Sequence, residues 1–237
     1  MQQETIQVIQ KELKVCFFVD GFTLRKVNDY YRFYHAHRSS INFLGFKHWA
    51  GVQASRCFWP DCSIDFMAHY YHPYRDPSKE TSIHSRVSLF ADELLKAGFN
   101  VHYGERNYAS ELCPNLELTE DALLYAKYKK MDALILATTQ GQYAELPLRL
   151  KNLNVPTLLL GWDFVYPSRS KEIHWHTDQN LRKNSAYYIA MERIMNVAGT
   201  SSDVLAKGLF LERKKRIDIT ACRGVSSDFQ RGMSRLA

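Results

Sequence analysis

Two short apolar segments, residues 132–138 (DALILAT) and 155–161 (VPTLLLG), constrain the fold of this chain more than any other feature. Both are nearly continuous runs of aliphatic side chains, and a helical segment at 143–152 separates them. Strands that are buried on both faces have this pattern, and a connection through a helix makes neighbouring strands parallel. The pair therefore predicts a parallel β-sheet that is covered by helices on both sides.

The alternation of strands and helices continues on either side of this pair. An amphipathic spacing of apolar residues supports each expected helix, and turn residues bound each expected strand. The expected strands are 14–20, 63–71, 99–103 and 172–176, and the expected helices are 23–37, 83–94, 119–130 and 185–195. Residues 38–62 mix Ser, Gly, Trp and Pro irregularly and fit either an insertion or a helix with a loop. The pattern predicts an α/β fold.

The formal charge of +6 is concentrated at the C-terminus. Residues 205–237 hold eight Lys and Arg against three acids, whereas the rest of the chain holds 23 against 22. We therefore expect a domain over 12–200 and a basic, flexible tail over 201–237. Its basic run, Lys214, Lys215 and Arg216, is suited to phosphate contacts, although solubility or a disordered end explains it equally well.

Cysteine usage and hydropathy indicate where the protein resides. The five cysteines are scattered, odd in number and without CxxC spacing, which favours reduced thiols over a disulfide framework. No apolar run is long enough to span a membrane, and the Gln/Glu-rich N-terminus does not read as a secretory signal. We expect a cytoplasmic protein with no membrane association.

In folds of this kind ligands bind outside the carboxyl ends of the strands, so the residues at those ends are the candidates for a site. Three segments that include them, VCFFVDGFTL, NLELTEDALLYAKYKKMDALIL and ATTQGQYAELPLRLKNLNVPTLLLG, resemble the NYN family of PIN-like nuclease domains. The likeness covers roughly residues 14–161. It implies a PIN-like, Rossmann-like sheet, and a cluster of carboxylates that binds Mg²⁺ or Mn²⁺ and activates water to cut RNA.

Carried over by position, the resemblance leaves two acids of an expected five. Asp20 and Asp121 are retained, whereas Asn115, Gln140 and Gln142 stand where the family has acids. Each amide removes a negative charge that a hard cation requires, so we expect no firmly bound cofactor and only weak binding of Mg²⁺ or Mn²⁺, by Asp20 and Asp121.

Two further features bear on what such a site does. Glu145 lies one helical turn beyond Gln142 and is a candidate substitute acid. The amides, together with Thr138 and Thr139 at the end of a strand, supply hydrogen-bond donors for RNA phosphates or bases.

These observations leave three hypotheses. The first is a nuclease-family protein with a degraded metal site that binds RNA or a partner with little or no catalysis. The second is an active Mg²⁺ or Mn²⁺ dependent ribonuclease that uses Asp20, Asp121 and a displaced acid. The third is a protein-interaction module whose aromatic residues mark a homodimer or partner face.

Overall fold

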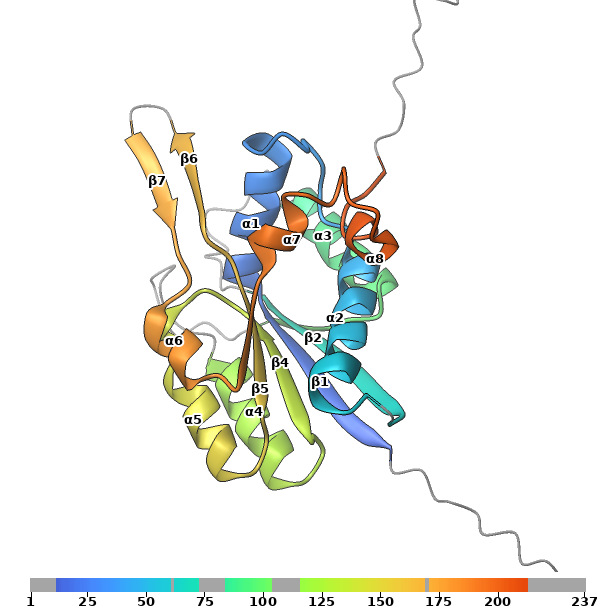
Figure 1. Ribbon diagram of the computed structural model, residues 1–237, viewed down its shortest axis with the longest axis vertical. Coiled ribbons are helices and arrows are strands. Elements are labelled where there is room, and N and C mark those ends of the chain that lie inside the picture. The colour runs from blue at the N-terminus through green and yellow to red at the C-terminus, as the bar shows by residue number, and fades with distance from the viewer. Residues whose placement is uncertain (1–11, 61, 73–83, 104–115, 169–170, 213–237) are drawn as a thin grey trace, which may run out of the picture.

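The computed structural model describes residues 12–60, 62–72, 84–103, 116–168 and 171–212. Within these residues, six strands form a parallel sheet that helices flank (Figure 1). The strand order is β3-β2-β1-β4-β5-β8, and every neighbouring pair is parallel. The strands are β1 (Leu13–Asp20), β2 (Ile64–His72), β3 (Asn100–Tyr103), β4 (Ala133–Ala137), β5 (Thr157–Gly161) and β8 (Tyr187–Ala190). The predicted α/β fold with a parallel sheet and flanking helices is confirmed.

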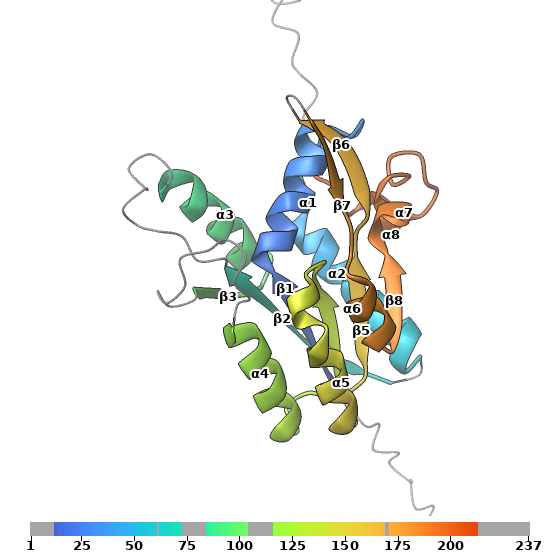
Figure 2. The same cartoon turned by 90° about the vertical axis from the view of Figure 1, so that its left-hand side faces the viewer.

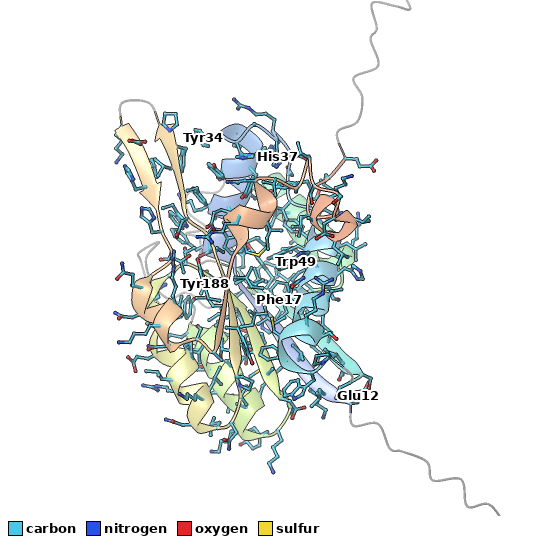
Figure 3. The ribbon with its side chains drawn as sticks, viewed as in Figure 1. Glu12, Phe17, Tyr34, His37, Trp49 and Tyr188 are labelled. Carbon is cyan, nitrogen blue, oxygen red and sulfur yellow. The ribbon has the colours of Figure 1, made fainter. Side chains whose placement is uncertain are left out.

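Helices cover both faces of the sheet because the strands alternate their apolar side chains between two core clusters. Phe17 and Trp49 lie in the first cluster (Figure 3), and Phe18 lies in the second. The first cluster packs α1 (Gly21–Phe33), α2 (Phe43–Phe58), α3 (His84–Lys96), α7 (Met191–Met195) and α8 (Val204–Lys207). The second packs α4 (Leu116–Lys127), α5 (Glu145–Asn152) and α6 (Gln179–Asn184). A 3-10 turn, η2 (Gly141–Tyr143), precedes α5.

The segment 38–62, which the sequence left open, contains the longest described helix. Asn42 caps α2, because its side chain accepts a hydrogen bond from the Gly45 backbone N–H at 3.2 Å. Gly45 is required there, since a Cβ would lie 1.9 Å from the Gly208 carbonyl oxygen. The helix therefore lies directly against the C-terminal part of the described chain.

Of the two elements expected after β5, one is confirmed and the other is wrong in part. The strand expected at 172–176 is present as β7 (Lys171–Trp175), which pairs antiparallel with β6 (Phe164–Ser168) in a separate two-stranded sheet. The helix expected at 185–195 begins instead with β8, the sixth strand of the main sheet, and only its second half is helical. Pairing with the buried strand β5 overrides the helical period of this segment.

The packed body extends beyond residue 200, where we expected the tail to begin. Ile41 and Phe210 form an antiparallel bridge, and Leu209 is fully buried in the first core cluster. The part of the chain assigned to the tail that lies past residue 212 is outside the described residues. Among the helices of the described residues, none is long and apolar enough to cross a membrane.

Candidate functional site

The strand order places a topological switch point between β1 and β4. From β1 the chain passes to β2 on one side, whereas from β4 it passes to β5 on the other. Ligands of open parallel sheets bind where such connections diverge, outside the carboxyl ends of the strands. At this point β1 ends in Asp20, and β4 is followed by Thr138, Thr139 and Gln140.

Asp20 lies at the centre of a hydrogen-bond network. It is the N-cap of α1, because its Oδ1 accepts from the Phe22 backbone N–H at 3.0 Å. Its Oδ2 accepts from the hydroxyls of Thr23 at 2.7 Å and Thr138 at 2.9 Å. Only 4% of Asp20 is exposed to solvent. Burial raises the pKa of the Asp20 carboxyl above its ordinary value, against the opposing effect of these hydrogen bonds.

The hydroxyls of Thr23 and Thr138 also form hydrogen bonds with the turn after β4. While Thr23 donates to Asp20, its oxygen accepts the Thr139 backbone N–H at 3.2 Å. Thr138 likewise accepts the Gln140 backbone N–H at 3.2 Å. The carboxylate therefore holds the β1–α1 junction and the turn after β4 together, and its oxygens are already engaged by donors within the protein.

The remaining residues predicted for this site do not join Asp20 as a metal cluster. Gln142 and Glu145 are exposed, and the Gln140 side-chain amide lies 3.4 Å from the Thr139 hydroxyl. Among the described residues, no group of three or more potential metal ligands within 4.8 Å of one another contains Asp20. Asn115, Lys214, Lys215 and Arg216 lie outside the described residues.

Asp121 belongs to a different cluster, which lies toward the β3 edge of the sheet. Its Oδ2 accepts a hydrogen bond from the Tyr71 hydroxyl at 3.0 Å and lies 3.7 Å from His102 Nδ1. The same His102 nitrogen lies 2.9 Å from Glu117 Oε1. Glu117 and Asp121 are four residues apart on α4, so they share one face of that helix. His102, Glu117 and Asp121 are half-buried and lie close enough together to contact one metal ion.

A second histidine supports this cluster from within the sheet. His69 Nδ1 lies 2.9 Å from His102 Nε2, and the two rings come from adjacent strands, β2 and β3. Burial, and next the neighbouring His102, lowers the pKa of His69 to about 4. Burial first and then Asp121 raise the pKa of Tyr71. Both groups are therefore neutral near pH 7.

Sequence reasoning missed His102, and it interpreted Glu117 as a helix-start or surface acid rather than as a ligand. His69 and His102 are 33 residues apart, and Glu117 is a further 15 residues along the chain, so no local spacing connects them. The available signal was the position of both histidines near the carboxyl ends of strands that are adjacent in the sheet. That signal becomes readable only once the strand order is known.

An aromatic wall borders the switch point. Phe22, in the first turn of α1, has its ring centroid 5.9 Å from that of Trp175 on β7, which in turn stacks on Phe164 of β6 at 6.1 Å. Lys26 Nζ lies 5.6 Å from the centroid of the Phe22 ring. Figure 2 shows β6 and β7 running alongside α1, and Phe164 also stacks on Tyr30 of that helix at 4.2 Å. Aromatic rings and a cation therefore stand next to the Asp20 network.

Comparison with known proteins supports the fold. No protein-family model matches the chain, and no curated protein matches it. The chain is similar to a crystal structure of a protein of unknown function from Vibrio parahaemolyticus, at 20% sequence identity and a TM-score of 0.51. The match covers 78% of this chain and 96% of that one. At this identity the similarity establishes a shared α/β fold.

Proposed function

We propose that this protein is an NYN-like member of the PIN-like nuclease superfamily that binds single-stranded RNA at the switch point without cleaving it there. The observation that carries the proposal is the hydrogen bonding of the Asp20 carboxylate. A catalytic carboxylate must offer its oxygens to a metal ion, whereas both Asp20 oxygens accept hydrogen bonds from the protein. The acid that the family would use for chemistry here has a structural function.

The charge around Asp20 supports the same proposal. Mg²⁺ and Mn²⁺ need anionic oxygen ligands, and the neighbouring strand end supplies Thr138, Thr139 and Gln140 instead of acids. A cation bound at Asp20 would have to displace the hydroxyl protons of Thr23 and Thr138. Binding would then cost two buried hydrogen bonds of about 1 kcal/mol or more each. Metal affinity at this position is accordingly expected to be weak.

RNA is the occupant that the surrounding groups fit. Single-stranded RNA is bound by stacking its bases on aromatic rings and by placing cations against its phosphates. The wall of Phe22 and Trp175 provides a ring surface beside the strand ends, and Lys26 provides the cation. The Gln140 amide adds a donor without adding negative charge.

Two measurements test the proposal. The first is incubation of the purified protein with single-stranded RNA and Mn²⁺, beside an Asp20→Asn variant. We expect no cleavage that depends on Asp20. Cleavage that vanishes in the variant would establish the ribonuclease hypothesis instead.

The second measurement is RNA affinity, by fluorescence anisotropy over a range of salt concentrations. Removing one stacking ring costs about 1–3 kcal/mol, so Phe22→Ala should weaken binding at least fivefold. Phe33→Ala is the matched control, because Phe33 is an exposed ring at the other end of the same helix. A flat salt response with equal affinities for both variants would favour the protein-interaction hypothesis.

A further inference from the structure

The cluster of His102, Glu117 and Asp121 has the arrangement of a metal site as well as its residue types. Ligand atoms bound to one zinc-like ion at ~2.1 Å lie about 3.0–3.4 Å apart. His102 Nδ1 is 2.9 Å from Glu117 Oε1 and 3.7 Å from Asp121 Oδ2. Small rotations of the two carboxylates would therefore place all three atoms around one ion.

The contacts behind these ligands hold them in place. The Tyr71 hydroxyl donates to Asp121, and the Tyr71 ring stacks on the His102 ring with centroids 4.4 Å apart. His69 contacts the other nitrogen of His102, which fixes the plane of the imidazole. In metal sites the nitrogen of a histidine that does not bind the ion is held in this way.

The burial of His69 indicates that the fold maintains its contact with His102. It is only 3% exposed, and its Nε2 is a buried atom with no hydrogen-bond partner among the described residues. A buried polar atom without a hydrogen-bond partner destabilises the folded state. The imidazole of His69 is held at that cost with its other nitrogen directed at His102.

We propose that His102, Glu117 and Asp121 bind a first-row divalent transition metal of the Zn²⁺ class, and that His69 is a positioning residue for His102. An imidazole nitrogen with two carboxylates suits Zn²⁺ better than Mg²⁺, which prefers oxygen ligands alone. Three protein ligands leave coordination positions open, and the partial exposure of all three side chains lets solvent reach the ion. The inference goes beyond the proposed RNA binding, since it does not involve Asp20.

The test is isothermal titration of the full chain with Zn²⁺ and separately with Mg²⁺, in the absence of RNA. We expect the wild-type protein to bind Zn²⁺ at least tenfold more tightly than Mg²⁺. Glu117→Gln, Asp121→Asn and His102→Ala should each weaken Zn²⁺ binding at least tenfold. Glu120→Gln is the matched control, because Glu120 is an exposed acid on the same helix, and it should leave Zn²⁺ affinity unchanged.

His69 is tested with His69→Phe, which keeps a ring but removes both nitrogens. Loss of a partner of this kind weakens metal binding about 10–100-fold. A fall of that size in a variant with an unaltered circular dichroism spectrum would support positioning.

Equal Zn²⁺ affinity in wild type, Glu117→Gln and Asp121→Asn would overturn the proposal and leave a simple hydrogen-bonded histidine. Glu117→Gln keeps the test decisive if His102→Ala fails to fold, because Glu117 is partly exposed and its replacement has nearly the same shape. Failure of RNA binding would not affect this result, because no RNA is present.

Discussion

If Asp20 has a structural role, its removal should destabilise the protein, and Asp20→Ala measures this directly. The change removes the cap of α1, worth about 1 kcal/mol, and leaves the hydroxyls of Thr23 and Thr138 without their acceptor, at about 1 kcal/mol each. Relief of the buried charge offsets part of this loss. We therefore expect the free energy of unfolding to fall by about 2 kcal/mol, with a smaller loss in Asp20→Asn, whose amide can still form part of the network.

Equilibrium urea unfolding, followed by circular dichroism at pH 7, measures these differences. Asp29→Ala is the control, because Asp29 is an exposed acid on the same helix, and its loss should change stability by no more than about 0.5 kcal/mol. Catalytic residues often behave in the opposite way, since replacing them relieves a strained site and stabilises the fold. An Asp20→Ala variant as stable as wild type, or more so, would refute the structural role.

Three further predictions follow from other features of the chain. Gly161→Ala should lower the free energy of unfolding by about 1–3 kcal/mol in the same urea assay. The reason is that the new Cβ would lie 2.5 Å from Thr177 Oγ1 and 2.9 Å from a ring carbon of Tyr188. An unchanged unfolding midpoint would contradict this prediction. Because folding raises the pKa of Asp20, its contribution to stability is fully present below the unfolded pKa of about 3.9 and is lost as the pH rises through the folded value. The stability of wild type relative to Asp20→Asn should therefore increase as the pH falls from 7 toward 4, and a constant difference across urea titrations in this range would be inconsistent with a raised pKa. Residues 213–237 hold seven Lys and Arg against two acids, so deleting them should weaken the salt dependence of RNA binding in anisotropy titrations. The slope of log affinity against log salt concentration should fall in magnitude by about 0.7 for each phosphate that the shortened chain no longer neutralises. An unaltered slope would place the phosphate-binding cations elsewhere.

The sequence predicted the central strands because their patterns are local. The segments around Phe17 and Leu159 are apolar throughout, as strands covered on both faces must be. By contrast, α2 has apolar side chains around much of its circumference and contains Gly45, since it packs against both the sheet and the segment at Gly208. A helix with so little contrast between its faces gives a weak periodic signal.

The two candidate sites also differ in how much of each one a local sequence pattern reveals. Asp20 stands out in the sequence because an acid ends an apolar run, but its partner Thr138 is 118 residues away, so the network that engages its oxygens is invisible at that level. The histidine cluster has no local signature, because the pairing of β2 with β3 brings its members together. Long-range strand pairing determines both arrangements.

The ends of the main sheet bear on how copies of this protein can associate. Among the strands of the described residues, the two at the edges of this sheet, β3 and β8, are only four residues long. A second molecule that extended the sheet at either edge would gain few main-chain hydrogen bonds, and short edges of this kind protect natural sheets from stacking into aggregates. Growth of the main sheet into fibrils by pairing at its edges should therefore be slow.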